Sequence, residues 1–233
     1  MEFFLTDWAV WTPELTLDDA SLIAAPELTQ VPAMTRRRLS KLTKLTFDVA
    51  LQLQASDNTP AAQQQLSTIF ASRHGDLHKT LGLLQQVAQQ EELSPTQFAL
   101  SVHNAIIGQL SLFSQNRADS NAIAAGADSL HYAVLEAAAR LQTEADLDQV
   151  LVLYADEPVP QVYQPFCRDP AQPVALALLL SRSQGEKVCF SRHSAPAQQA
   201  SEQQTLQLLP WLQQQCHAVS IAGRQCQWQW QRG

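Results

Sequence analysis

Two uninterrupted apolar runs constrain the fold of this chain more than any other feature. They lie within "DQVLVLYADE", residues 148–157, and "PVALALLLSR", residues 173–182. Neither run alternates apolar and polar residues, as a strand with one solvated face does, so we expect both faces of each strand to be covered. Both runs are also too short to cross a bilayer. The sequence therefore predicts central strands of a sheet that has helices on both faces.

Weaker patterns supply the remaining elements. Branched and aromatic residues predict three further strands, at 2–11, 66–72 and 119–125. Apolar residues at spacings of three and four predict helices at 35–53, 77–87, 103–114, 128–141 and 203–215. The order of strands and helices predicts an α/β fold with a mostly parallel five-stranded sheet, the fifth strand antiparallel, in a single domain over residues 1–233.

Two C-terminal segments are expected beside this sheet. The segment 187–192 is short and follows the strand 173–182, so we expect the two to pair. The segment "CQWQWQR", residues 226–232, alternates as an edge strand does. Its Trp228 and Trp230 are expected at that edge, and a contact with a partner protein stays open for them.

Charge and cysteine spacing exclude several classes of function. The net charge is −7 and the pI about 5.3, which is the wrong sign for a bulk nucleic-acid binder. The N-terminus lacks the basic region of a secretory signal, and we expect a cytoplasmic protein without membrane contact. The four cysteines match no metal-ligand spacing, so we expect reduced thiols, no metal and no cofactor.

The stretch 98–141 contains a strand, a tight corner of small residues and then a helix. In many enzymes such a corner presents a nucleophile at the helix N-terminus, where the helix dipole lowers the pKa of a thiol. Here the corner reads Ala-Ala-Gly-Ala, residues 124–127, and carries neither a thiol nor a hydroxyl. Asp128, which follows, is expected to cap the next helix.

From Ser94 to Ala138 the chain resembles the N-terminal half of β-ketoacyl synthases without a gap. The similarity rests on short motifs in one common register: Ser94-Pro95, Asn104 with Gly108, Arg117 with Ser120, and Ala137-Ala138. The turn "ASRHGDL" at 71–77 and the strand ending at Glu157 are similar as well. The resemblance implies a single half of the thiolase fold.

Two departures from the family pattern imply a subunit without catalytic activity. In the shared register the ketosynthase cysteine falls on Ala127, which cannot form a thioester. The paired catalytic histidines of ketosynthases lie in a second half for which this chain is too short. Chain length factors are the group of thiolase-fold proteins that matches both departures. The segments "VPAMTRRRLSKL" and "FALSVHNAI" resemble the chain length factors of bacterial aryl polyene pathways. The resemblance implies a heterodimer with an active β-ketoacyl synthase and transient contact with an acyl carrier protein.

The same register implies roles for individual residues. Side chains that would reach the partner's acyl tunnel and gate it are Gln97, Phe98 and Ser101. Residues expected at the interface with the partner are His103, Asn104, Ile107, Leu110, Asn121 and Ile123. The basic cluster of this acidic chain is either a solvated helix face or a docking surface for the carrier protein, and it comprises Arg36, Arg37, Arg38 and Lys41, with Lys44 nearby.

Alternatives from other classes stay open at this point. One is a thiolase-fold pseudoenzyme that pairs with itself and has a scaffolding or acyl-binding role. Another is an active acyltransferase or hydrolase. Residues of the types found in a hydrolase triad occur near one another in sequence, namely Ser101, His103, Asp128, Ser129 and His131. The Gly-x-Ser-x-Gly pattern of such enzymes is absent, however. A metal site at His74, Asp76 and His78 is disfavoured, because the His-Glu-x-x-His pattern is missing.

Overall fold

The computed structural model describes residues 1–13, 25–56, 65–167, 172–196, 200–201 and 204–233. Its strands, in chain order, are β1 (Glu2–Trp11), β2 (Ser67–Ala71), β3 (Ser120–Ile123), β4 (Gln149–Asp156), β5 (Val174–Ser181), β6 (Glu186–Ser194), β7 (Ala218–Ala222) and β8 (Cys226–Arg232). Its helices are α2 (Ala33–Arg36), α3 (Lys41–Ser56), α4 (Leu77–Ala88), α5 (Pro95–Ala99), α6 (Ala105–Ser114), α7 (Ser129–Thr143), α8 (Gln204–Leu212) and the 3₁₀ turn η2 (Gln161–Tyr163).

The α/β class is confirmed, but the prediction of a mostly parallel five-stranded sheet is wrong in detail. The sheet has eight strands in the order β3-β2-β4-β5-β1-β6-β8-β7. Only β3, β2 and β4 pair in parallel, whereas every pairing from β4 to β7 is antiparallel. The antiparallel fifth strand was predicted correctly. It lies inside the sheet because the N-terminal strand β1 pairs along its other side.

The two C-terminal predictions are also corrected. The segment 187–192 belongs to β6, which pairs with β1 and β8 and not with β5. The segment 226–232 is β8, which lies between β6 and β7 rather than at the edge. Its alternation reflects one buried face, since Trp228 and Trp230 are fully buried while Gln227 and Gln229 are exposed. An alternating pattern therefore indicates that one face of a strand is exposed to solvent. It does not indicate that the strand lies at the edge of the sheet.

The predicted helix at 35–53 is interrupted. Residues 37–40 separate α2 from α3, and the Ser40 hydroxyl then accepts a hydrogen bond from the Thr43 N–H at 3.2 Å. This capping interaction starts α3 afresh, as serine does at many helix N-termini. The other predicted helices lie within about two residues of their observed ends, except that α8 ends at Leu212, before Gln213–Gln215.

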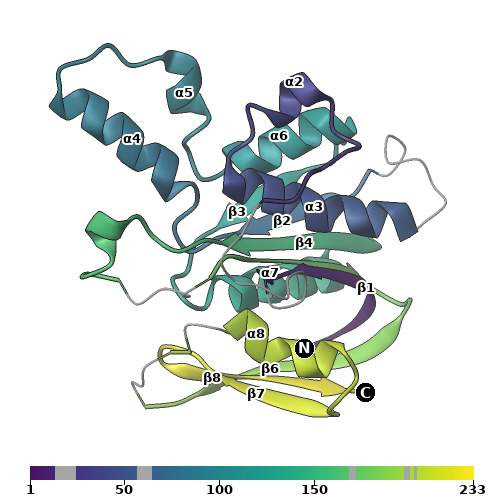
Figure 1. The fold of residues 1–233 in the computed structure, drawn as a ribbon. Helices are drawn as coiled ribbons and strands as arrows, with labels where there is room; N and C mark the ends of the chain where they lie inside the picture. The colour runs from purple at the N-terminus through teal and green to yellow at the C-terminus, as the bar shows by residue number, and fades with distance from the viewer. Residues whose placement is uncertain (14–24, 57–64, 168–171, 197–199, 202–203) are drawn as a thin grey trace.

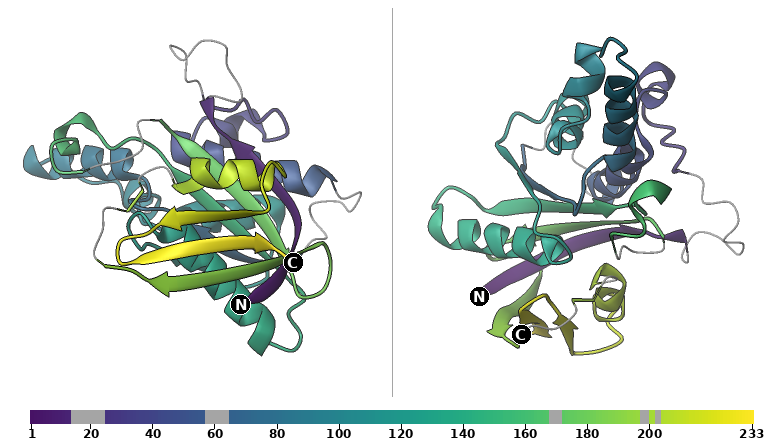
Figure 2. Two further views of the ribbon diagram at one scale, coloured as in Figure 1. Left: turned by 90° about the horizontal axis from the view of Figure 1, so that it is seen from below. Right: turned by 90° about the vertical axis from the view of Figure 1, so that its left-hand side faces the viewer.

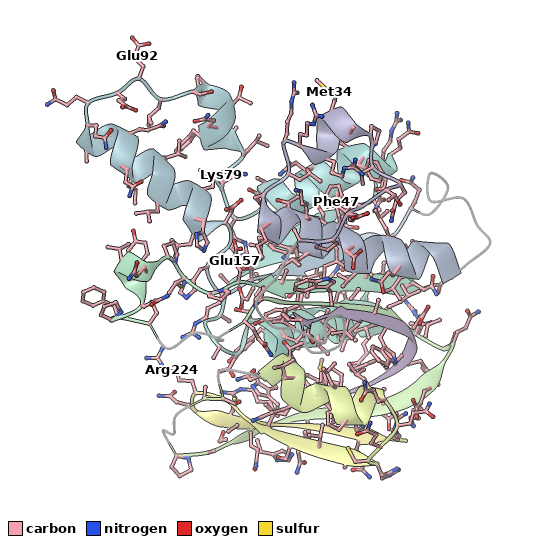
Figure 3. The ribbon with its side chains drawn as sticks, viewed as in Figure 1. Met34, Phe47, Lys79, Glu92, Glu157 and Arg224 are labelled. Atoms are coloured by element: carbon pink, nitrogen blue, oxygen red, sulfur yellow. The ribbon has the colours of Figure 1, made fainter. Side chains whose placement is uncertain are left out.

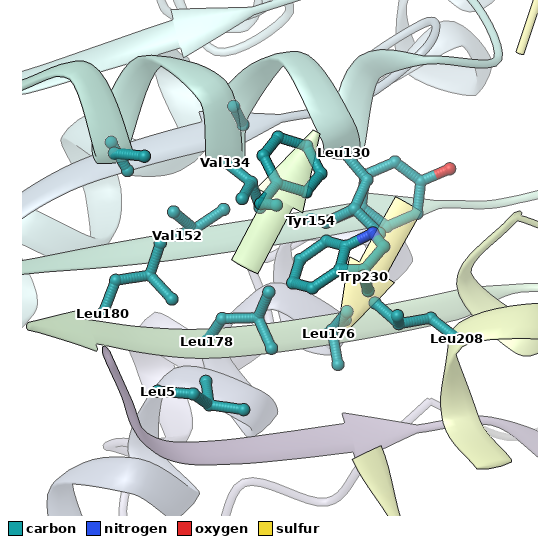
Figure 4. Packing of buried hydrophobic residues seen from close by; sticks show 14 of the residues in the cluster. Leu5, Leu130, Val134, Val152, Tyr154, Leu176, Leu178, Leu180, Leu208 and Trp230 are labelled. Carbon is teal, nitrogen blue, oxygen red and sulfur yellow. The ribbon is translucent and has the colours of Figure 1, made fainter. Parts of the chain in front are cut away.

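Helices cover the sheet on both faces (Figure 1). One core joins α3 and α6 to β1, β2, β4 and β5, with Phe47, Phe70 and Leu153 at its centre. On the other face, α7 contributes Leu130 and Val134 to a second core that also contains Trp230 and Leu208 from the C-terminal segment (Figure 4). Strands β6, β8 and β7 curl beneath α7 (Figure 2), so this central helix is packed on two sides.

Two helices stand away from this body. Helices α4 and α5 and their connection form an arm, residues 77–102, which carries Glu92 at its tip in Figure 3. Apolar side chains exposed along the arm are Leu84, Val87, Leu93, Phe98 and Val102. No helix within the described ranges is both long enough and apolar enough to span a bilayer.

Candidate functional site

The corner between β3 and α7 is a braced turn without a reactive side chain. Gly126 adopts a left-handed backbone with φ of +61°. The Ser129 hydroxyl accepts a hydrogen bond from the Ala125 N–H at 2.9 Å and donates one to the Gly126 carbonyl at 2.7 Å. Ala127, half-buried, lies within this brace and offers only a methyl group. The turn therefore fixes the start of α7 but supplies no nucleophile.

Asp128 does not cap α7 with its side chain, which corrects the sequence prediction. The buried carboxylate instead accepts hydrogen bonds from Gln204 Nε2 at 2.8 Å, the Arg224 N–H at 3.0 Å and Trp228 Nε1 at 3.1 Å. The turn residue Gly223 approaches so closely that an added Cβ would lie 2.7 Å from Asp128 Oδ1. The start of α7 is thereby tied to α8 and to the β7–β8 turn.

Aromatic rings fill the space between α7 and the C-terminal strands. The His131 ring stacks on Trp228 at 5.1 Å, and Phe190 stacks on the same indole at 5.6 Å. Among the described residues, no hydrogen bond of good geometry reaches either His131 nitrogen. Burial lowers the pKa of His131 to about 4, although the nearby Asp128 carboxylate opposes this shift. His131 is therefore a neutral packing residue at pH 7.

The structure does not assemble a hydrolase triad. Ser129 and Asp128 use their side chains in the contacts given above, and His131 lies in the aromatic stack. The Ser101 hydroxyl donates to the Phe98 carbonyl at 2.8 Å, and a ring nitrogen of His103 lies 2.9 Å from the Ser72 carbonyl. None of these side chains is paired as a nucleophile and base.

Two of the residues at which a metal site was disfavoured, Asp76 and His78, have structural contacts too. Asp76 is the N-cap of α4, accepts from the Lys79 N–H and pairs with the Lys79 ammonium group at 3.1 Å. A ring nitrogen of His78 lies 2.8 Å from the Pro158 carbonyl. Within the described ranges, no three His, Cys, Asp or Glu side chains are grouped to hold a metal ion.

An open groove of about 550 Å³ runs between α6 and β3. Residues lining it are His103, Asn104, Ile107, Gly108, Ser120, Asn121, Ala122 and Ala124. Four of the predicted interface residues are thus brought together. Leu110 is instead buried beneath α6 with 3% exposure, and Ile123 packs against the core around α7.

Within the described part of the chain, strand β3 is one free edge of the sheet. The carbonyl groups of Asp119 and Ile123 accept from β2, so by alternation the N–H groups of Ser120 and Ala122 point to the open side. The Ala122 N–H is satisfied by the Asn121 side-chain oxygen at 2.8 Å. An unpaired edge next to a groove is a surface onto which another strand can add.

The exposed stripe of α6 also favours a partner. Asn104, Gly108 and Leu112 are spaced by four residues and exposed, with Leu112 at 83%. A Cβ added at Gly108 would have no atom within 4 Å. A glycine within a helix lowers the stability of the helix by about 1 kcal/mol relative to alanine. No atom of the described chain lies close enough to Gly108 to explain why a side chain is missing there. The clear space at Gly108 fits the close approach of another molecule.

A charged network anchors the start of β3. Arg140 of α7 lies 2.7 Å from both the Asp119 carboxylate and the Ser67 hydroxyl, and its other donors bind Glu144 at 2.7 and 2.9 Å. Burial alone would raise the pKa of Asp119, but hydrogen bonds from Arg140 and Ser67 outweigh it and lower the pKa. The free edge is therefore held in a fixed register.

The three predicted gating residues lie on or beside α5. Phe98 is 58% exposed, whereas Ser101 is half-buried. Gln97 lines a hollow of about 540 Å³ between α4, α5 and the segment before α3. The other residues around this hollow are Arg38, Lys79, Gly82, Leu83, Gln86, Thr96 and Leu100.

The basic cluster is only partly available for docking. Arg36 donates to the carbonyl groups of Glu27 at 3.1 Å and Leu28 at 3.3 Å, which holds its side chain against the chain. Arg37 and Arg38 are exposed, and Lys41 is half-buried at the start of α3.

One buried polar network was not predicted from the sequence. The Asp156 carboxylate accepts from the Tyr154 hydroxyl at 2.6 Å, the Ser72 hydroxyl at 2.8 Å and the Arg73 N–H at 2.8 Å. Burial raises the pKa of Asp156 despite these donors. The network joins the ends of β2 and β4. The feature of the sequence that could have indicated it is an acidic residue at the end of an apolar strand.

Comparison with known proteins places these features in one family. The model of the β-ketoacyl synthase N-terminal domain matches residues 8–231. A chain of the complex of the ketosynthase ApeO with its chain length factor ApeC from Xenorhabdus doucetiae is 32% identical, with a TM-score of 0.84 and 100% of both chains covered. No curated protein matches this chain.

More distant structures share the fold. A β-ketoacyl synthase from Burkholderia phymatum is 10% identical, with a TM-score of 0.53, 76% of this chain covered and 53% of its own. The AntDE:AntF complex, a type II polyketide acyl carrier protein with its ketosynthase, is 12% identical, with a TM-score of 0.60, 84% of this chain covered and 69% of its own. The chain therefore belongs to the β-ketoacyl synthase family, in which it matches the N-terminal domain.

Proposed function

We propose that this protein is a non-catalytic chain length factor, which pairs with an active β-ketoacyl synthase and shapes its acyl tunnel during polyene or polyketide elongation. The observation that carries the proposal is the braced corner at residues 124–127, which keeps the shape of a nucleophile elbow and has Ala127 where a nucleophile would lie. A condensing enzyme needs a thiolate there, and a methyl group cannot replace it.

The packing of α7 supports the same conclusion. In this chain the C-terminal strands and α8 close the second side of α7, and His131, Trp228 and Trp230 leave that side filled with side chains. An acyl chain bound behind the corner would have to displace this aromatic core. The X. doucetiae complex adds support, because its matched chain is covered in full and is described as part of a ketosynthase–chain length factor pair.

The surface available for the partner is the β3 edge with the adjoining groove. We infer that a strand of the ketosynthase adds to β3, and that His103, Asn104, Ile107 and Asn121 face it. Leu110 and Ile123 would support this surface from beneath. An obligate pair of this kind should bury a total of more than ~2,000 Å².

The arm provides side chains that can reach into a partner. Phe98 is apolar and exposed on α5, so it is the first of the three gating candidates to reach a neighbouring protein, with Gln97 and Ser101 beside it. A chain elongates only while open volume remains at its far end, and overlap with a fixed side chain costs roughly 1–3 kcal/mol. A tenfold change in product partition needs only ~1.4 kcal/mol.

Transient contact with an acyl carrier protein is also proposed. Exposed Arg37 and Arg38, with Lys41, form a positive surface on an acidic chain, and such a surface attracts an acidic carrier domain. The AntDE:AntF complex is described as a carrier protein bound to its ketosynthase. If the carrier protein docks on the partner subunit instead, this basic cluster is a solvated surface.

Co-expression with a candidate β-ketoacyl synthase tests the function. We expect a one-to-one complex by size-exclusion chromatography with mass measurement, whereas the chain alone should aggregate through its free β3 edge. The complex should condense acyl units to a defined length. A well-behaved homodimer that ignores the ketosynthase would favour a self-paired scaffold or acyl-binding pseudoenzyme instead.

A further inference from the structure

We propose that the hollow between α4 and α5 is the end chamber of the acyl tunnel and that Gly82 sets its depth. The inference rests on the proposed function, because the acyl chain must arrive from the partner ketosynthase. Nothing in the sequence patterns pointed to Gly82, which lies on α4 opposite the α5 residues.

The hollow has the size and lining of a ligand site. Its volume of about 540 Å³ is within the range of pockets that enclose small molecules. Its wall is mostly apolar, and Leu83 and Leu100 are among the residues that line it. Gln97 lies on this wall and directly precedes exposed Phe98, so the hollow adjoins the part of the arm proposed to meet the partner.

Gly82 is the second, independent observation. It lies within α4, is exposed, and an added Cβ would meet no atom within 4 Å. Glycine is a poor helix former, so its presence within a helix needs a reason. No described atom of this chain provides one, because the space in front of Gly82 is clear. That space fits a group that comes from outside the chain.

The chemistry of the wall favours the far end of an apolar acyl chain as this group. The Lys79 ammonium is already held by the Asp76 carboxylate and the Leu100 carbonyl, both at 3.1 Å, so it offers the hollow little free charge. Arg38 is exposed at the rim, and a guanidinium plane stacks well on a flat conjugated group. A planar polyene end would thus lie between Gly82 and Gln97, with Arg38 over it.

Substitution at Gly82 within the reconstituted complex tests the depth. Gly82→Leu should shift the main product to a shorter chain by at least one two-carbon unit, and Gly82→Ala should shift a smaller fraction. Gln85→Leu is the matched control, because Gln85 is exposed on the same helix but does not line the hollow, and its product should be unchanged. An unaltered product length with Gly82→Leu in an intact complex would overturn the inference.

Photo-crosslinking gives a second readout that needs no variant. An acyl group with a diazirine at its far end, loaded onto the partner ketosynthase of the wild-type complex, should label a peptide within residues 77–102 of this chain. Labelling confined to the ketosynthase would refute the end chamber even if Gly82→Leu failed to assemble. If the wild-type chain formed no complex, the proposed function itself would fail, which is a distinct result.

Discussion

The Asp128 carboxylate accepts a hydrogen bond of 3.1 Å from the indole N–H of Trp228, a residue 100 positions later in the chain. This contact joins the first residue before α7 to the middle of β8. It ties the start of α7 to the C-terminal strands, which with α8 cover the second side of this helix.

Removal of this carboxylate should destabilise the fold. Asp128→Ala leaves the buried indole N–H of Trp228 without this acceptor and removes one of the two acceptors of Gln204 Nε2, which keeps the Ala222 carbonyl. We expect a loss of about 3 kcal/mol in the free energy of unfolding. Urea denaturation of the protein, with its partner if required, measures the loss. Asp148→Ala is the control because Asp148 is exposed. Equal stability of the two variants would show that the tie between α7 and β8 is unimportant.

His131 should make stability depend on pH. Its folded pKa of about 4 lies below the unfolded value of 6.5, so the unfolded state binds more protons between these limits. Stability should therefore fall as the pH drops from about 6.5 to about 4, by up to about 3 kcal/mol. His131→Phe keeps an aromatic ring against Trp228 and should flatten this part of the curve of melting temperature against pH.

The control for this experiment is His217→Gln, because His217 is exposed. That variant should keep the wild-type dependence on pH. If His131→Phe retained the full acid sensitivity, another group would be responsible, and the packing account of His131 would be wrong.

The groove beside β3 should be sensitive to added volume. Gly108→Phe meets open space in the free chain but would occupy the groove, so the Kd for the ketosynthase should rise at least tenfold, about 1.4 kcal/mol. Gln229→Phe places the same ring on the exposed face of β8, far along the sheet, and should bind normally. Titration calorimetry distinguishes the two, and equal affinities would remove the groove from the interface.

The sequence predicted the layered α/β core well and the sheet edges poorly. The segments 148–157 and 173–182 contain uninterrupted apolar runs because both faces of β4 and β5 are covered, and that information is local. Strand order is not local. Nothing in residues 187–192 or 226–232 indicates that β1 lies between β5 and β6, or that β7 pairs outside β8.

The candidate site was predictable only in part. The register with ketosynthases indicated the corner at Ala127 and the α5–α6 segment, because sequence motifs lie there. It gave Asp128 a capping role, since a helix start with Asp is the common case, whereas the carboxylate binds residues 76 to 100 positions away. The roles of Gly82 and Gly108 depend on empty space around them, which no sequence pattern reports.

Product length should respond to side chains on the arm. Phe98→Ala should lengthen the product or broaden its distribution, because it removes a ring that we place at the tunnel. Ser101→Phe should shorten the product, and Gln97→Ala should lengthen it, with the complex intact in each case. Chromatography with mass detection of the reconstituted system measures the lengths. If none of the three changes moves the distribution, the gate lies within the ketosynthase.

The location of covalent chemistry tests the central claim most directly. The heterodimer would be incubated with a labelled acyl thioester, and the intact mass of each subunit would then be measured. The account predicts one acyl group on the ketosynthase and none on this chain, because Ala127 has no atom to acylate and the Ser129 hydroxyl beside it is engaged in bracing the turn. A stable acyl adduct mapped to any cysteine or serine of this chain, at the stoichiometry of turnover, would contradict it.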